Sequence, residues 1–254
     1  MKSIFLLVLL ISNFAFCQPK SKLPRLEKIN WNGEKLDLKT NSLIQKSVVP
    51  LSFCAAGLLL NQTEIKTNLQ ASFLNPFNGY KTTLDDYIQY APIVQMYGFD
   101  FLRLPARNSI WNQSKYLVVS ELVTAGIVHL LKNTLKVLRP DGSARTSFPS
   151  GHTGQAFVAS QVLFNEYYRT RPALALSGYL FSASTGALRI INNRHWVPDV
   201  FMGAGIAILV TNVVYYFEPL KNWDPFKKAN SDTSILVVPE FRNETYGMNL
   251  KIRF

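Results

Sequence analysis

Two of the three histidines in this 254-residue sequence lie in short polar stretches that border long apolar segments. One of these stretches is SFPSGH, residues 147–152, which stands directly before an apolar run. Ser150 and Gly151 are ordinary residues for a helix start, but they also let the backbone approach an anion while free N–H groups of the first helical turn point towards it. His152 would then lie beside the bound anion. The stretch fits both a plain helix start and a phosphate cradle.

The second stretch is LRIINNRHWVPD, which ends at Asp199. Asp199 follows His195 by four residues, so its carboxylate is expected one helical turn from the imidazole. A carboxylate in that position fixes the imidazole tautomer and stabilises the protonated ring. Arg189, six residues before His195, adds a cation. Without a function, Asp199 is a first-turn helix residue behind Pro198, and His195 is a loop residue.

A stripe of cations ends the apolar helix that is predicted over residues 115–138. At about 100° per residue, four side chains of this region fall within an arc of roughly 80°: His129, Lys132, Lys136 and Arg139. Cations near a helix C-terminus also complement the helix macrodipole, which is a structural reason for their presence. Pro140 ends the helix. We expect His129 to be a helix residue without a role in the site.

Together the stretches form a pattern that none of them makes alone. In order along the chain it comprises Lys132, Arg139-Pro140, Pro149-Ser150-Gly151-His152, Arg189, His195 and Asp199. This order and spacing resemble the motifs of the phosphatidic acid phosphatase type 2 and vanadium haloperoxidase superfamily, over roughly residues 115–217. Leu188 departs from the family pattern, which usually has serine before this arginine.

The resemblance implies phosphoryl transfer through a covalent intermediate, with no metal and no cofactor. His195 is the implied nucleophile, which would form a phosphohistidine, and Asp199 would orient and activate it. His152 is the implied general acid for the leaving alcohol. The implied phosphoryl-binding residues are Lys132, Arg139, Ser150, Gly151 and Arg189. Weaker candidates for contacts with a headgroup, by their nearness in sequence, are Lys136, Arg145, Asn192, Asn193 and Arg194.

Four long helical patterns must position these residues, and they predict an all-α fold, a helical bundle of the phosphatidic acid phosphatase type 2/haloperoxidase type. They span residues 115–138, 151–169, 172–191 and 198–217. Each is rich in small residues, which permit close helix packing in water or in lipid. Only the last offers about 18 uncharged apolar residues, the usual threshold for a membrane span. We therefore expect a membrane-associated or partly embedded helical domain over residues 47–222.

The two ends of the chain are expected to lie outside this domain. Residues 1–17 have a basic start and a short apolar run, which is the layout of a secretory signal peptide. Acylation of Cys17 is the less favoured alternative, because bulky Phe16 precedes it. Residues 18–46 are interpreted as a polar exported linker, and alternating segments within residues 223–254 predict a small β-hairpin.

The charge balance narrows the class of partner. The sequence has 27 Lys and Arg against 16 Asp and Glu, which gives a formal net charge of +11. This balance favours anionic partners such as lipid headgroups, phosphorylated substrates or nucleic acid. With the motifs and the apolar helices, the expected partner is a phosphorylated lipid or another phosphate ester at a membrane, on the periplasmic side of the envelope. A nucleic acid partner is not expected, and the oligomeric state is undefined.

Four functions remain open from the sequence. The favoured one is hydrolysis of a lipid phosphate: a phosphatidate-like lipid, undecaprenyl pyrophosphate or a phosphate of lipid A. The cleavable signal and the short helices favour instead a soluble periplasmic non-specific acid phosphatase. A vanadate-dependent haloperoxidase would use the same residues, although such enzymes are typically much longer. A non-catalytic envelope protein is expected to lack a motif residue, and none is missing here.

Overall fold

The structure, a computed structural model, describes residues 38–77, 79–217, 219–220 and 223, and the backbone of two strands at 234–242 and 245–253. The predicted signal peptide and most of the predicted linker lie outside these residues. The described end of that linker is helical instead, because helix α2 already begins at Leu38. The polar residues between Leu38 and Lys46 include no glycine or proline to break a helix.

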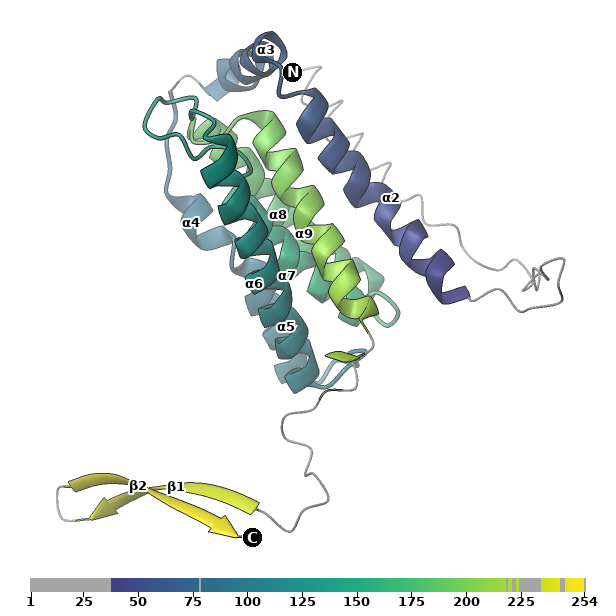
Figure 1. Cartoon of the computed structure of the whole chain (residues 1–254), viewed down its shortest axis with the longest axis vertical. Coiled ribbons are helices and arrows are strands. Elements are labelled where there is room, and N and C mark those ends of the chain that lie inside the picture. The colour runs from purple at the N-terminus through teal and green to yellow at the C-terminus, as the bar shows by residue number, and fades with distance from the viewer. Residues whose placement is uncertain are drawn as a thin grey trace, which may run out of the picture. The chain divides into compact units, whose positions relative to one another are not determined.

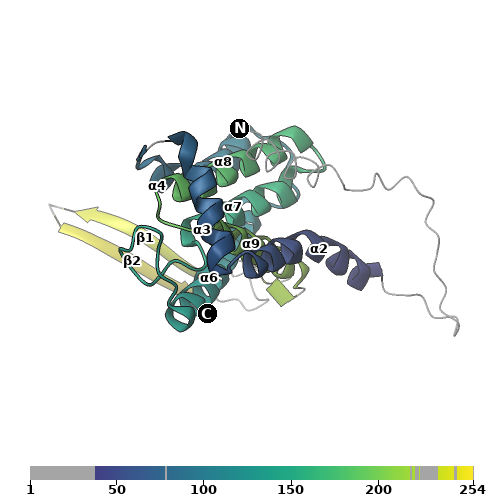
Figure 2. The same cartoon turned by 90° about the horizontal axis from the view of Figure 1, so that it is seen from above.

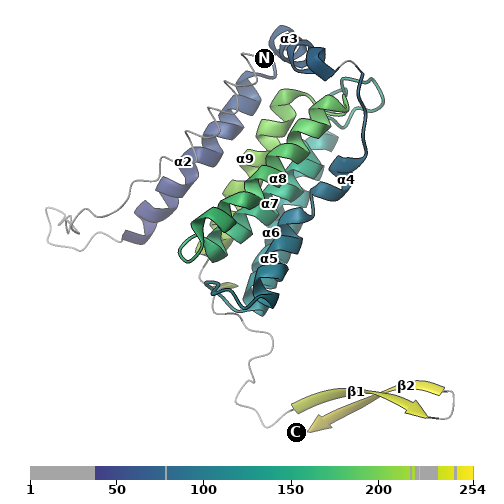
Figure 3. The same cartoon turned by 180° about the vertical axis from the view of Figure 1, so that it is seen from behind.

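Among the described residues, five long helices build the bundle (Figure 1). They are α2 (Leu38–Leu59), α6 (Ile110–Leu135), α7 (Gly151–Tyr167), α8 (Pro172–Ile191) and α9 (Val197–Tyr216). α7 packs against α6, α8 and α9, and α2 packs along α9. Figure 3 shows α7 and α8 from the opposite side, with the short α5 (Ala91–Phe101) beside them. The predicted all-α bundle is confirmed.

The core of the bundle forms around α7. Val158, Val162 and Leu163 of this helix are fully buried. They pack with Met96 of α5 and Ala207 of α9 in one hydrophobic cluster. Since α7 begins at Gly151, this packing fixes the helix start that the motif residues occupy.

α2 and α9 lie so close at their crossing that the position of Gly205 on α9 has no room for a side chain. A Cβ atom added at Gly205 would lie 2.6 Å from Cys54 Sγ and 2.8 Å from the carbonyl oxygen of Pro50, both in α2. A side chain at position 205 would force the two backbones apart, so the close packing of α2 and α9 requires glycine there. The contact holds α9 in place along its length.

The bundle has an apolar exterior, and its interior holds polar side chains beside the hydrophobic core. On α6, Val118, Leu122 and Leu130 are more than half exposed, whereas Ser120 and Thr124 of the same helix are buried. The interior contains further polar side chains, including Gln113, Ser160, Gln161, Glu166, Ser182, Thr185, Thr211 and Asn212. This many exposed large apolar side chains, with so many buried polar ones, suit a lipid environment better than water.

Three of the described helices are long and apolar enough to cross a membrane: α6, α8 and α9. The bent pair of α2 and α3 adds a fourth span if it is counted as one. By uncharged length, only the last of these helices was expected to reach the threshold for a span. The isolated Glu121 and Lys132 of α6 leave that helix apolar enough on average.

α3 (Thr63–Leu74) turns across the end of the bundle, at a bend of 104° from α2 (Figures 1 and 2). Nε2 of Gln70 donates to the carbonyl oxygen of Ile190 at 3.2 Å and to Oδ1 of Asn193 at 2.9 Å, so α3 is fastened to the end of α8. The chain then forms η1 (Asn75–Phe77) and α4 (Leu84–Ile88). α4 packs against α8 beside the motif residues.

Residues 218–254 form a separate unit. It contains β1 (Ser234–Arg242) and β2 (Thr245–Arg253), which pair antiparallel with Ser234 opposite Arg253. The hairpin that the sequence predicts for residues 223–254 stays a prediction, and no predicted site residue lies in this unit.

Candidate active site

The predicted site residues meet at the end of the bundle where α6 and α8 finish and α7 and α9 begin. Lys132 lies in the last turn of α6 and Arg189 in the last turn of α8. His152 lies in the first turn of α7 and Asp199 in the first turn of α9. The N-termini of α7 and α9 add partial positive charge to this end, and the two cations offset the negative C-termini.

The cations after α6 do not form the single helical stripe that the sequence predicts. α6 ends at Leu135, and Lys136 adopts the left-handed conformation with a φ of 47°. The chain then leaves the helical path because the N–H of Ser147 donates to the carbonyl oxygen of Val137 at 2.9 Å. Arg139 therefore reaches the site from a loop, and Lys136 is exposed.

Two arginines of the site have hydrogen-bond donors to spare. Within the described residues, Nε of Arg139 and Nε of Arg189 are buried and have no hydrogen-bond partner. Burial lowers the pKa of Arg139, and the charge of the Arg189 guanidinium acts in the same direction. Nζ of Lys132 donates to the carbonyl oxygen of Thr146 at 2.5 Å and so holds the loop that leads into SFPSGH. The spare N–H groups are suited to an anion.

The SFPSGH segment is bound to the start of α9. The N–H of Ser150 donates to the carbonyl oxygen of Asp199 at 3.0 Å, and its Oγ shares a hydrogen bond with Oγ1 of Thr153 at 2.9 Å. A Cβ atom added at Gly203 would lie 2.5 Å from the carbonyl oxygen of Ser150. The polar groups of Ser150 are thus engaged within the protein, and the N–H groups of the following turn remain for an anion, since they lack partners within a helix.

His195 and Asp199 form a buried pair. His195 is 2% exposed, and its Nδ1 lies 3.4 Å from Oδ2 of Asp199. The same oxygen accepts hydrogen bonds from the N–H of Trp196 at 2.9 Å and from Oγ of Ser147 at 2.5 Å. Burial lowers the pKa of His195 to about 4 although Asp199 acts against it, so the imidazole is neutral at neutral pH, as a nucleophile requires. The contact of Ser147 with Asp199 was not predicted. The only indication in the sequence was the position of Ser147 just before Pro149-Ser150-Gly151-His152.

Two carboxylates that no sequence motif marks enter the site from α4. Oδ2 of Asp85 lies 2.5 Å from Nη1 of Arg189, and Oδ1 of Asp85 accepts from Nδ2 of Asn192 at 2.7 Å. Oδ1 of Asp86 lies 3.0 Å from Nε2 of His152 and 3.5 Å from Nη1 of Arg189. In the sequence these are two ordinary acids in the first turn of a short helix.

His152 is partly exposed at this point. Burial and the charge of Arg189 lower its pKa, while Asp86 and Asp85 act in the opposite direction. A phosphate dianion beside the ring would favour its protonated form, because an opposite charge within a few ångströms raises the pKa of an imidazole. The position therefore suits a group that takes up a proton as an anion binds.

A cavity of about 630 Å³ opens on this cluster. Its charged lining side chains are those of Lys81, Asp85, Asp86, Arg139, Asp141, Arg189 and Arg194, with His152 beside them. Of the weaker candidates, Asn192, Asn193 and Arg194 also line it, and Arg194 pairs with Asp141 at 3.3 Å. Arg145 is exposed and, with Lys136, is not part of the lining. The nucleophile candidate His195 is buried and is not among the lining residues.

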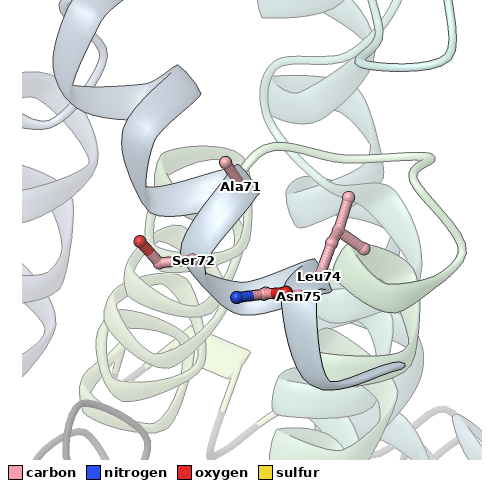
Figure 4. Close-up of a pocket in the computed structure, with 4 residues that line it drawn as sticks. All are labelled: Ala71, Ser72, Leu74 and Asn75. Atoms are coloured by element: carbon pink, nitrogen blue, oxygen red, sulfur yellow. The ribbon is translucent and has the colours of Figure 1, made fainter. Parts of the chain in front are cut away.

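Other polar features lie apart from this cluster. His129 is exposed on α6, where its Nε2 hydrogen-bonds to Nδ2 of Asn133. A second hollow of about 540 Å³ at the end of α3 is lined by Ala71, Ser72, Leu74 and Asn75 (Figure 4). It has no charged lining side chain. No group of three or more His, Cys, Asp or Glu side chains within the described residues is placed to share a metal ion.

Comparison with known proteins places the motif region in a described family. Residues 113–223 match the PAP2 superfamily. The chain is 30% identical over 232 residues to the lipid A 1-phosphatase of Porphyromonas gingivalis, and this alignment covers 80% of the chain and 51% of the relative. It is 30% identical over 132 residues to the lipid A 4'-phosphatase of Helicobacter pylori, and this alignment covers 46% of the chain and 63% of the relative. The chain thus spans about half of the first relative and less than two thirds of the second.

Two solved structures are also similar. The crystal structure of Aquifex aeolicus LpxE aligns with a TM-score of 0.45 and 21% identity, over 59% of this chain and 94% of that one. A transmembrane PAP2-type phosphatidylglycerolphosphate phosphatase from Bacillus subtilis aligns with a TM-score of 0.44 and 17% identity, over 74% of this chain and 99% of that one.

Proposed function

We propose that this chain, whose residues 113–223 match the PAP2 superfamily, is a phosphatase that hydrolyses a lipid phosphate through a phosphohistidine intermediate. The observation that carries the proposal is the buried pair of His195 and Asp199, at 3.4 Å, beside two arginines with spare buried N–H groups. A neutral imidazole next to unpaired cationic donors is what nucleophilic attack on a phosphoryl group requires.

In the first step, Nε2 of His195 attacks the phosphorus atom while Asp199 holds the ring by Nδ1. The new N–P bond forms as the bond from phosphorus to the leaving oxygen breaks. His152 gives a proton to that oxygen, a general-acid contribution of about 10²–10⁴-fold. Lys132, Arg139, Arg189 and the N–H groups at the start of α7 bind the phosphoryl oxygens as their charge is redistributed.

In the second step, water attacks the phosphohistidine. His152, now neutral, takes the proton from that water, and the N–P bond breaks with its electron pair returning to His195. Inorganic phosphate leaves, and both histidines regain their first protonation states. The chain supplies every proton acceptor and donor in this cycle, so we propose that no metal ion takes part.

The proposed substrate is a lipid phosphate because of where the site lies. Its cavity opens at one end of helices whose outward faces are apolar, so a lipid can keep its chains beside the bundle while its phosphate enters. A soluble acid phosphatase would gain nothing from that exterior. The relatives named for lipid A make a phosphate of lipid A the first candidate, with phosphatidate-like lipids and undecaprenyl pyrophosphate next.

Trapping the covalent intermediate tests the mechanism. Full-length protein in detergent is mixed with a radiolabelled lipid phosphate and quenched in alkali, in which phosphohistidine is stable. We expect label on the wild-type protein and on the His129→Gln variant, which changes an exposed histidine away from the site. His195→Gln should carry no label and should not turn over. Label or turnover that survives in His195→Gln contradicts the nucleophile assignment.

Two further assays test the remaining parts of the proposal. Hydrolysis of a panel of lipid phosphates and of a water-soluble chromogenic ester separates a lipid phosphatase from a non-specific acid phosphatase. Retention of activity in EDTA is expected, and its loss contradicts the metal-free cycle. Bromide oxidation that requires vanadate would identify a haloperoxidase instead. Export to the periplasmic side, with a signal at residues 1–17, is tested by protease accessibility in spheroplasts.

A further inference from the structure

The carboxylate of Asp86 lies where the proposed mechanism needs an oxygen of the substrate. Its Oδ1 is 3.0 Å from Nε2 of His152 and 3.5 Å from Nη1 of Arg189. Under the proposed function these two side chains serve the same phosphate ester, since His152 protonates the leaving oxygen and Arg189 binds a phosphoryl oxygen. An oxygen that already bridges both groups takes up the position of that ester.

Asp86 differs from its neighbour Asp85 in how it is held. Asp85 is 1% exposed and is bound by both Arg189 and Asn192, so it is part of the packed structure. The side chain of Asp86 is 52% exposed, and the ion pairs of its carboxylate are to His152 and Arg189. α4 has only five residues, and its N-cap residue Thr83 makes no capping bond through its side chain. Asp86 can therefore swing away without uncovering a buried contact.

The charges that line the cavity favour an exchange of one anion for another. Four cations, Lys81, Arg139, Arg189 and Arg194, face three carboxylates, Asp85, Asp86 and Asp141. With Asp86 withdrawn, the lysine and arginine charges exceed the carboxylates by two, and a protonated His152 adds a third, so a phosphate monoester dianion is favoured. With Asp86 in place the excess is one charge lower, and its carboxylate already bridges His152 and Arg189.

We infer that Asp86 is a built-in competitor, whose carboxylate closes the site by bridging His152 and Arg189 until a phosphate group displaces it. The inference rests on the proposed function of the site. It means that the apparent affinity for phosphate is reduced by the fraction of molecules in which Asp86 is withdrawn. It also means that His152 and Arg189 are held by this carboxylate while no substrate is present.

Replacing Asp86 by asparagine tests the inference, with Asp86→Ser as a second variant. The readouts are the inhibition constant of vanadate, KM and kcat for a chromogenic phosphate ester, and the rise in thermal unfolding temperature that vanadate causes in detergent. Because an exposed ion pair contributes little free energy, we expect the inhibition constant and KM to fall by roughly threefold to tenfold. kcat should equal or exceed that of the wild type, and vanadate should stabilise both variants more than the wild type.

Asp141→Asn is the matched control, since Asp141 lines the same cavity and pairs with Arg194 rather than with His152 or Arg189. It removes the same charge and should change vanadate affinity by less than twofold. An equal gain in Asp141→Asn would overturn the inference, because net charge alone would explain the effect. A fall in kcat with unchanged vanadate affinity in Asp86→Asn would also overturn it, because Asp86 would then assist His152. If the proposed function itself is wrong, the wild type will neither hydrolyse phosphate esters nor bind vanadate.

Discussion

Replacing Gly203 by alanine should damage the site from a position that contacts no substrate. The added Cβ would lie 2.5 Å from the carbonyl oxygen of Ser150, and ordinary contact begins at 3.4 Å. α7 and α9 must therefore separate by the difference of 0.9 Å, because the obstructing atom belongs to the backbone and has no rotamer to change. That separation pulls Ser150 from Asp199, whose carbonyl oxygen it binds at 3.0 Å.

Both the stability and the rate should reveal this separation. Overpacking of this kind costs about 1–3 kcal/mol in the free energy of unfolding. A misplacement of about 1 Å between catalytic groups costs roughly 100-fold in rate. We expect kcat for a chromogenic phosphate ester to fall by ~10–100-fold at a temperature well below the unfolding transition, where the protein is folded.

Gly154→Ala is the matched control for this experiment. Gly154 lies in α7 at the same crossing, but an added Cβ would meet Thr124 Cγ2 at 3.5 Å and the carbonyl oxygen of Gly203 at 3.7 Å, which are ordinary contacts. Alanine also favours the helix by up to ~1 kcal/mol over glycine. Gly154→Ala should therefore keep its activity and its stability. If Gly203→Ala behaves like Gly154→Ala in both assays, the crossing does not set the geometry of the site.

Three further predictions concern the buried pair and its neighbour. Asp199→Asn should lower kcat by about 10²–10⁴-fold while the protein stays folded, because an amide no longer holds the reactive tautomer of His195. Steady-state kinetics measure the loss of rate, and circular dichroism checks that the variant is folded. Ser147→Ala removes a donor to the buried carboxylate, so we expect a loss of about 1–3 kcal/mol in chemical denaturation and a smaller fall in kcat than for Asp199→Asn. The free energy of unfolding should rise with pH between about 4 and 6.5, because the folded pKa of His195 is about 4 and the unfolded chain binds more protons in that window. His195→Asn should flatten this rise, and an unchanged slope in that variant would refute the burial of a neutral imidazole.

Most of the helical framework could be predicted because its signals are local. The apolar periods of 172–191 coincide with α8, and Gly151 marks the start of α7 as the sequence indicated. The end of α6 could not be predicted from periodicity, since Lys136 turns left-handed in response to a backbone bond between Ser147 and Val137. That bond joins residues of a loop whose path depends on tertiary packing.

The two carboxylates of the site, Asp85 and Asp86, could not be predicted for a related reason. The motifs identify His152 and Arg189, whose types and spacing are distinctive. Nothing in the sequence near Asp85 and Asp86 indicates that these two carboxylates pair with His152 or Arg189. The pairing arises because α4 packs against α8, far along the chain. Long-range pairs between common residue types leave no local pattern, so only the fold reveals them.

The fastening of Ser150 to Asp199 also sets an order of events during synthesis. The proposed phosphate-binding segment emerges from the ribosome well before α9, the last helix of the bundle. The carbonyl oxygen that accepts from the N–H of Ser150, the glycine at the helix crossing and the carboxylate paired with His195 all belong to α9. A chain that is still being made therefore has the earlier motifs but no working site. The proposed phosphatase activity should therefore begin only when the final helix is in place, and unfinished or truncated chains should be inactive.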